Sequence, residues 1–228
     1  NGRVTDYTHR LIEVSKEIEP DREVADLVNQ ALAPFREELS EVVGETRLPL
    51  DRGRNLESTM DNFLLEALLD QTGAQVAFSN GWRYGAPVLP GPICVGDLYN
   101  MAPMNPPVST VDLSGAEIKQ MLEENLEHTF ARDPFNQMGG YLKRAAGIRV
   151  FMKIENPPMQ RIHKLFVGQE EVQPEKRYRA VFITAQGVPG RYGQNRQALP
   201  EKTMEVLRAY LKKSGPLEVG LKETYTVI

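Results

Sequence analysis

Apolar residues recur every three to four positions in four segments of the chain, and each segment is expected to form a helix. The first segment lies between Pro20 and Gly44, and Pro34 inside it is expected to kink or split the helix. The second begins at Ser58 or Thr59, because either side chain can accept a hydrogen bond from the first turn. The pattern therefore predicts a connecting helix followed by a helix that opens the globular part of the chain.

Two later helices have equally clear boundaries. Ser114 and Glu117 form a capping box, in which the serine hydroxyl accepts from the third backbone amide and the glutamate reaches back. The last helix follows Pro200, and Gly215 is its expected end.

Several short stretches are expected to form strands, because they are alternately or continuously apolar. They comprise residues 74–78, 147–154, 164–167 and 178–185. Residues 3–14 also alternate, but a lone strand cannot bury a face, so this segment is expected to belong to a missing domain. Residues 86–108 hold many prolines and glycines and are expected to be irregular, apart from a short helical turn at 95–98.

The order of these elements predicts the fold class. Helices and strands are interleaved, but the later strands follow one another without helices between them. We therefore expect an α+β fold with a mixed β-sheet flanked by helices, and not a doubly wound parallel sheet. The length of 228 residues suits one large domain or a domain with an appendage.

Charge and composition exclude some classes of partner. The chain has 27 basic and 31 acidic residues and no block of Lys and Arg, so neither nucleic acid nor an anionic membrane is an expected partner. It has no run of 18 apolar residues that would predict a membrane span. A single cysteine, Cys94, rules out an internal disulfide. The chain starts at Asn1 without Met or a signal peptide, and we interpret it as a fragment or a processed chain.

Common catalytic motifs do not account for a function. The histidines His9, His128 and His163 are far apart, and none has a second His or Cys at ligand spacing. There is no G-x-S-x-G motif and no Walker A motif, and Cys94 has no histidine near it in sequence. Structural roles are therefore expected for the three histidines and for Cys94.

Two loops have the character of a binding site. Residues 79–85 follow a buried strand and contain Asn80, Arg83 and Tyr84, which offer an amide, a guanidinium fork and an aromatic surface. Residues 186–196 form a glycine-rich loop after another strand. Loops at strand ends are common places for ligands, although on composition alone both segments are also explained as ordinary surface loops.

Three stretches of the sequence also occur in a characteristic order. The first runs from Glu57 to Leu68, the second joins Asn80-Gly81-Trp82-Arg83 to Leu113–Ile118, and the third includes Gly187–Tyr192. Together they resemble the C-terminal domain of the 5'-nucleotidase and UDP-sugar hydrolase family, over about residues 20–220.

Within that family the chain is most similar to the SoxB thiosulfohydrolase subgroup. The likeness rests on Trp82-Arg83-Tyr84-Gly85, on Val88–Gly91 and on Asp133–Gly140. The resemblance implies hydrolysis of a phosphoester or an S-thiosulfonate by the full-length protein, with a small anion or a carrier-protein-bound thiosulfonate as the substrate. It also implies a periplasmic or extracellular location.

The resemblance divides the chain into three parts. Residues 1–18 are expected to be a remnant of an N-terminal metallophosphatase domain of the same chain, residues 19–44 a linker helix, and residues 45–228 the substrate-binding domain. Divalent metals, Mn or Zn, are expected in the missing domain, where they would activate a water. No cofactor, metal ligand or catalytic residue is assigned to the fragment itself, which is predicted to be inactive alone.

The substrate-binding residues that the resemblance implies are Asn80, Arg83, Tyr84, Arg54, Met104 and Tyr192. Tyr192 would form one wall of an aromatic clamp for a base, and Met104 stands where the family has the other aromatic residue. Since stacking on a base is worth about 1–3 kcal/mol, this replacement is expected to weaken nucleoside selection. The alternative is a non-catalytic ligand-binding or scaffolding module that keeps the family fold.

Overall fold

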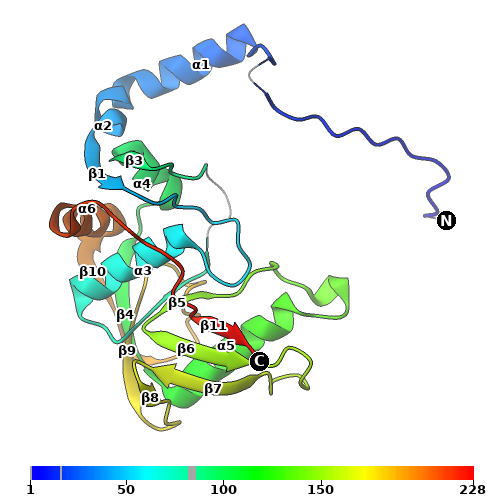
Figure 1. Ribbon diagram of the computed structural model, residues 1–228, viewed down its shortest axis with the longest axis vertical. Helices are drawn as coiled ribbons and strands as arrows, with labels where there is room; N and C mark the ends of the chain where they lie inside the picture. The colour runs from blue at the N-terminus through cyan, green and yellow to red at the C-terminus, as the bar shows by residue number, and fades with distance from the viewer. Residues whose placement is uncertain (1, 16, 82–85) are drawn as a thin grey trace. The chain divides into compact units, whose positions relative to one another are not determined.

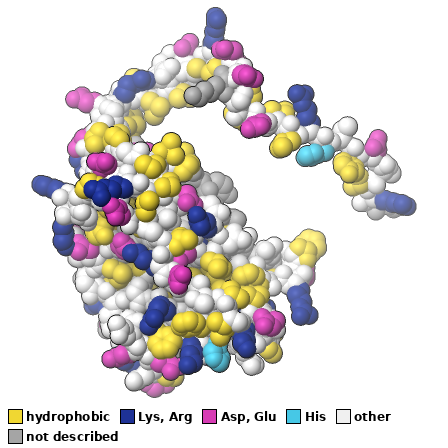
Figure 2. Space-filling view, viewed as in Figure 1, with side chains coloured by type: hydrophobic (Ala, Val, Ile, Leu, Met, Phe, Trp, Pro, Cys, Tyr) yellow, Lys and Arg dark blue, Asp and Glu magenta, His cyan; other side chains and the backbone are white. Residues whose placement is uncertain are grey.

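The computed structural model describes residues 2–15, 17–81 and 86–228. Its contacts divide the chain into two units, Asn1–Glu38 and Leu39–Ile228, whose elements are labelled in Figure 1. Acidic and basic side chains are interspersed over the face of the molecule that Figure 2 shows.

The N-terminal unit is helical after residue 21. Helix α1 spans Arg22–Leu32 and begins at Asp21, whose side chain accepts from the backbone amide of Val24 at 3.0 Å. The 3-10 turn η1 (Ala33–Phe35) contains Pro34 and separates α1 from α2 (Arg36–Ser40), as expected. Residues 3–14 form no strand, which corrects the sequence prediction, since no partner strand pairs with them among the described residues.

The first helical segment ends earlier than expected. Strand β1 (Val42–Thr46) follows α2 directly, so residues 42–44 are extended and not helical. Val42 and Val43 are β-branched and suit a strand, and β1 pairs antiparallel with β3 (Gly91–Cys94). Pairing with a distant segment decides the conformation here, which helical periodicity cannot reveal.

A five-stranded mixed sheet forms the centre of the larger unit. Its order is β10 (Gln194–Lys202), β4 (Pro107–Ser114), β9 (Arg177–Phe182), β2 (Val76–Ser79) and β5 (Arg144–Ala146). Strands β2 and β9 are parallel, and the other neighbours are antiparallel. This arrangement, flanked by helices, confirms the predicted α+β class.

A second sheet of four strands lies after β5 in the chain. Its order is β11 (Tyr225–Val227), β6 (Ile148–Met152), β7 (Ile162–Val167) and β8 (Glu170–Glu171). Strand β11 is parallel to β6, and the remaining pairs are antiparallel. The strands predicted at 147–154 and 164–167 are therefore confirmed as the centre of this sheet.

The remaining helices largely follow the predicted boundaries. They are α3 (Thr59–Thr72), α4 (Val95–Met101), α5 (Gly115–Thr129), the 3-10 turn η2 (Pro134–Asn136) and α6 (Thr203–Ser214). Ser58 caps α3, and the Ser114–Glu117 capping box starts α5. Within residues 86–108, the helical turn predicted at 95–98 is present as the start of α4. The expectation of irregular structure was wrong for β3, for the end of α4 and for the start of β4.

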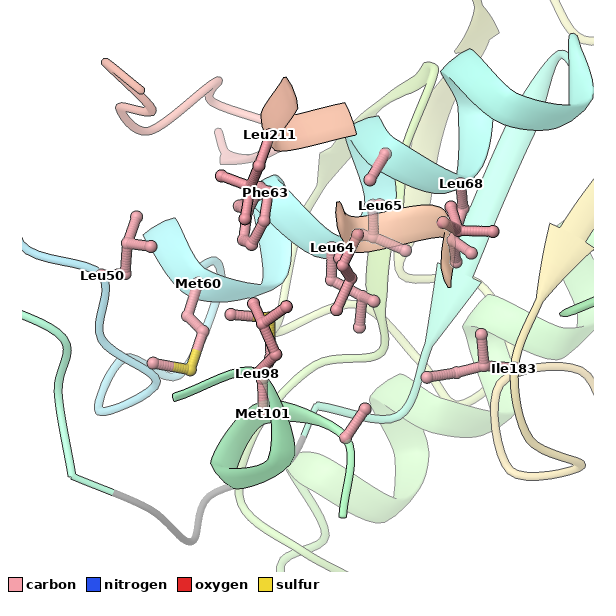
Figure 3. Close-up of a cluster of buried hydrophobic side chains, with 14 of the residues drawn as sticks. Leu50, Met60, Phe63, Leu64, Leu65, Leu68, Leu98, Met101, Ile183 and Leu211 are labelled. Atoms are coloured by element: carbon pink, nitrogen blue, oxygen red, sulfur yellow. The ribbon is translucent and has the colours of Figure 1, made fainter. Parts of the chain in front are cut away.

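Two apolar cores hold the larger unit together. The first lies among α3, α4 and α6, where Phe63, Leu64, Leu98 and Leu211 are buried (Figure 3). The second includes Ile118 and Leu122 of α5 and side chains from both sheets. Helix α3 is buried on most of its surface, so it acts as an internal support for β2 and for the loop that follows it.

Candidate functional site

The two loops that the sequence singled out begin at the same edge of the five-stranded sheet. Strands β2 and β9 are parallel neighbours, in the register Phe78 to Phe182. Their carboxyl ends therefore lie together, and the chain continues from them into residues 79–81 and 183–193. Gly187 fits tightly against β2, since a Cβ atom there would lie 2.9 Å from the carbonyl oxygen of Phe78. This is a sheet edge at which α/β folds commonly place ligands.

A pocket of about 550 Å³ lies at this edge. Its polar lining residues are mainly Asn80, Glu124, Tyr141, Lys143, Gln186 and Arg191. Asn80 follows β2, Gln186 and Arg191 follow β9, and Glu124 lies on α5. Both predicted loops thus contribute to one pocket, together with α5 and the residues just before β5.

Asn80 is held in place by its neighbours. Its side-chain amide donates to the hydroxyl of Tyr141 at 3.2 Å, and the Ser79 hydroxyl accepts from the backbone amide of Gly81 at 3.3 Å. Gly81 has φ +71°, and a Cβ atom there would lie 2.9 Å from Nε of Arg144. A side chain at position 81 is therefore excluded by both backbone strain and space.

A buried charged cluster lies beneath this loop. Nε of Arg144 donates to Oδ2 of Asp61 at 3.0 Å, and Nε of Arg52 lies 3.3 Å from Oδ1 of the same carboxylate. Arg144 also donates to the backbone carbonyls of Asn55 and Arg54 at 3.1 and 2.5 Å. Two guanidinium groups share one carboxylate, so this support of the loop carries a positive charge. Burial, opposed by the Asp61 carboxylate, lowers the pKa of Arg52.

The loop after β9 is fixed by an arginine of the following strand. Arg196 donates to the backbone carbonyls of Val188, Pro189 and Tyr192 at 3.1, 3.0 and 3.1 Å. The backbone amide of Gly193 donates to Oε1 of Glu117 at 2.9 Å, which connects the loop to the start of α5. The loop therefore has a defined shape, and its Gln186 carbonyl and Arg191 side chain have defined positions at the pocket.

Lys143 is the most perturbed titratable group of the pocket. The residue is 6% exposed, and its ammonium donates to the backbone carbonyl of Gln186 at 2.6 Å. Burial lowers the pKa of Lys143 to about 8, although the nearby Glu124 carboxylate acts in the opposite direction. The sequence gives no sign of this role, because Lys143 belongs to no recognisable motif and becomes buried only through tertiary contacts.

The predicted site residues have different fates. Asn80 lines the pocket, whereas Arg83 and Tyr84 lie outside the described residues. Arg54 is exposed and accepts a hydrogen bond from Arg144 through its backbone carbonyl.

The two positions assigned to an aromatic clamp do not line this pocket. Met104 is 77% exposed, and Tyr192 is 4% exposed and belongs to the second core. The Tyr192 ring is covered by the Arg191 guanidinium, 4.9 Å from the ring centre. Neither side chain therefore offers a ring face to a ligand in the pocket.

The described residues do not provide a metal site. No group of three or more His, Cys, Asp or Glu side chains within them is placed to hold a metal ion. His9 and His128 are exposed, and Cys94 precedes α4, where its backbone amide donates to Asp97 at 2.7 Å. No helix of the described part has both the length and the apolar character needed to cross a membrane.

Comparison with protein families gives a match over most of the larger unit. The model of the family described as "5'-nucleotidase, C-terminal domain" matches residues 37–185. Among solved structures, the sulfate thiohydrolase SoxB of Thermus thermophilus has a TM-score of 0.81 and 30% identity, covering 90% of this chain and 38% of that chain. A 5'-nucleotidase precursor, also from Thermus thermophilus, has a TM-score of 0.75 and 24% identity, covering 92% and 44%.

Similar curated proteins are longer than this chain. The trifunctional nucleotide phosphoesterase protein YfkN of Bacillus subtilis (strain 168) is 30% identical over 145 residues, 58% of this chain and 10% of its own length. Protein UshA of Escherichia coli (strain K12) is 24% identical over 201 residues, 86% of this chain and 34% of its own length. The chain thus spans about a third or less of each of these two relatives.

Proposed function

The chain belongs to the family of 5'-nucleotidase C-terminal domains, and we propose that it is the substrate-binding domain of a hydrolase whose catalytic metals are held by another domain. The family includes nucleotidase and phosphoesterase hydrolases. The observation that carries the proposal is the meeting of two loops in one pocket, with Asn80 from one loop and Arg191 from the other. A neighbouring domain would present its metal centre to the ligand that these residues hold.

The division of labour follows from the residues available. In the proposed enzyme, divalent metal ions, Mn or Zn, supply an activated water in a metallophosphatase domain of the same protein. The described residues of this chain do not fit such a site. Their proposed contribution is to bind and orient the substrate, and the chain alone is expected to have no hydrolase activity.

We further propose a SoxB-like specificity, for a small anion or a carrier-protein-bound thiosulfonate, in a periplasmic or extracellular protein. The likeness to the sulfate thiohydrolase extends over 90% of this chain at 30% identity. Met104 and Tyr192 do not line the pocket, which argues against a base held between two aromatic rings there. In this proposal residues 1–18 derive from the metal-binding domain, and residues 19–44 connect it to residues 45–228.

The test uses the full-length protein with Mn²⁺. Hydrolysis is measured for nucleotides, UDP-sugars and a protein-bound S-thiosulfonate, and the last is the expected substrate. Asn80→Ala removes an amide from the pocket and is expected to raise KM several-fold or more, since one hydrogen bond contributes about 0.5–1.5 kcal/mol. Arg83→Ala, which the resemblance places in the site, is expected to remove most of kcat/KM.

Asn100→Ala is the matched control, because Asn100 is exposed on α4 and does not line the pocket. A full-length protein that hydrolyses none of the three substrate classes would count against an enzyme and favour the non-catalytic binding module. Equal kinetics of the Asn80 and Asn100 variants would remove the pocket from the reaction.

A further inference from the structure

The charge on Lys143 is poorly compensated. An ammonium group has three N–H donors, and the Gln186 carbonyl, at 2.6 Å, accepts one of them. Within the described part of the chain, no second acceptor is hydrogen bonded to Nζ and no carboxylate forms an ion pair with it. A cation that is 6% exposed has also lost most of its water. Such a group is unfavourable unless a partner with negative charge is present.

Hydrogen bonds to the backbone amide and to the backbone carbonyl of Lys143 fix its position. Its amide donates to Oδ1 of Asn125 on α5 at 2.7 Å, and its carbonyl accepts from the hydroxyl of Tyr225 on β11 at 2.5 Å. Because the next residue begins β5, the backbone cannot move the ammonium out towards solvent without breaking strand contacts. The ammonium is therefore held at the pocket before any ligand arrives, which reduces the ordering cost of binding.

The neighbouring groups leave the pocket with a positive charge. Glu124 on α5 forms an ion pair with Arg191 from the loop after β9, so much of its charge is already neutralised. His128 on α5 and Tyr141 before β5 are the other titratable side chains in the lining. Besides the histidine and the tyrosine, two basic side chains face one acidic side chain in this lining. The depressed pKa of Lys143, about 8, agrees with an ammonium that lacks a close counter-ion.

We propose that this pocket binds the oxyanion group of a small organic ligand, with the Lys143 ammonium and the Asn80 amide as donors. The amide has two N–H groups, and Tyr141 accepts one of them. Met121, Met138 and Pro189 give the same pocket an apolar part. A volume of about 550 Å³ exceeds the needs of an inorganic anion and suits a ligand with a short apolar portion.

Carboxylates, phosphates and sulfates or sulfonates share this chemistry, since each accepts charge-assisted hydrogen bonds from an ammonium. The physiological identity of the ligand rests on the proposed function, but the binding chemistry belongs to this chain alone. Binding can therefore be measured without metal ions and without any hydrolysis, so failure of one proposal is distinguishable from failure of the other.

The experiment titrates the 228-residue chain with butanoate, inorganic phosphate and sulfate at constant ionic strength. Binding affinity is measured by calorimetry for the wild type and the variants, and NMR of the lysine ε-carbons reports on Lys143 in the wild type. Saturable binding of at least one anion is expected to shift the Lys143 signal and to raise its pKa. Lys143→Met is expected to weaken binding about 10- to 100-fold, the usual range for a hydrogen bond to a charged group. The anion that binds most tightly identifies the class of ligand group.

Lys119→Met is the matched control, since Lys119 lies on α5 but lines a different pocket. It should bind as the wild type does. The affinity of the wild type for butanoate and sulfate, whose own charge does not change in this range, is expected to fall above about pH 8, by up to about 10-fold per pH unit, because the neutral amine does not attract an anion. This pH titration tests the proposal even if a variant fails to fold.

Two outcomes would overturn the proposal. One is the absence of saturable binding with all three anions. The other is binding that does not depend on Lys143. Such binding would be weakened equally by Lys143→Met and Lys119→Met, or its affinity would stay unchanged between about pH 8 and 10, the range in which the Lys143 ammonium loses its proton.

Discussion

Of the residues that line the pocket, Asn80 could be predicted from the sequence, whereas Lys143 could be recognised only from the structure. Asn80 could be selected from sequence, because an amide directly after a buried strand is a plausible ligand contact. Lys143 could not, because its burial depends on Asn125 from α5, Gln186 after β9 and Tyr225 from β11. These contacts join parts of the chain that are 18, 43 and 82 residues apart from it. No local pattern records such a meeting.

Lys143 makes a prediction about stability and pH. Its folded-state pKa, about 8, lies below the usual value of 10.5. Between these values the unfolded chain binds more protons than the folded chain, so the folding stability of the wild type should rise with pH from about 8 to 10.5. Below pH 8 the buried charge costs ~3–4 kcal/mol. Lys143→Met is therefore expected to raise Tm by several degrees at about pH 7 and to lose this advantage near pH 10.5.

Thermal unfolding at a series of pH values measures this effect. Lys119→Met serves again as the control, because Lys119 is exposed and removal of its charge relieves no burial. An advantage of the Lys143 variant that does not shrink between pH 8 and 10.5 would show that the ammonium is not destabilised in the fold.

At the scale of secondary structure, elements with local signals were predictable. The capping box at Ser114 and Glu117, the cap at Ser58 and the end of α6 near Gly215 are all present as predicted. These signals depend on neighbours within one turn of helix, so a single sequence is enough to identify them.

Elements that depend on distant partners were missed. Strand β4 begins at Pro107, and a proline is tolerated at the first residue of a strand because its missing backbone N–H costs little there. The prolines around this position predicted a loop instead. Strand β10 is polar and mostly exposed at the sheet edge, so it has no apolar alternation to detect. Both strands are defined by pairing with each other over long sequence separation.

The Glu117 side chain connects the start of α5 to the loop after β9, and its removal tests how much this connection stabilises the fold. Its carboxylate accepts from the backbone amide of Ser114 at 2.7 Å and from that of Gly193 at 2.9 Å. Glu117→Ala is expected to lower the free energy of unfolding by about 1–3 kcal/mol, since two backbone donors lose their acceptor. It should also speed hydrogen exchange at Gly193, which follows the loop of the pocket.

Glu205→Ala is the matched control. The Glu205 carboxylate caps α6 by accepting from the backbone amide of Lys202 at 2.8 Å, and among the described residues it accepts from no second backbone amide. It should reproduce the loss of the cap without changing exchange at Gly193.

Burial alone would raise the pKa of Glu117, but hydrogen bonds from Ser114 and Gly193 and the charge of Arg177 lower it. Its contribution is therefore present above the usual carboxyl pKa and is lost as the pH falls through the lowered value.

At the scale of the whole molecule, the larger unit has what a stable domain requires. Both apolar cores are built from residues after position 42, and both sheets lie entirely within Leu39–Ile228. Fold class and domain type were accessible from sequence because they rest on the order of many elements. The pocket could be predicted only in part from the sequence. The loops after β2 and β9 were recognised separately, and only the sheet topology shows that they meet.

The arrangement of the cores predicts the result of a truncation. Among the residues that the structure describes, neither core contains a buried side chain from the first 38 positions. A chain of residues 39–228 is therefore expected to unfold cooperatively, with a Tm within a few degrees of that of the 228-residue chain. Anion binding at Lys143 should also persist, because every residue that lines the pocket lies between positions 80 and 191. Calorimetry and the same NMR titration measure both properties.

A second truncation, which starts at Gln75 and so removes β1 and α3, is the control. It should not fold, because the first core then loses its central helix. If the 39–228 chain were equally unfolded, residues 1–38 would be part of the folding unit, and the assignment of the binding site to an independent domain would be wrong.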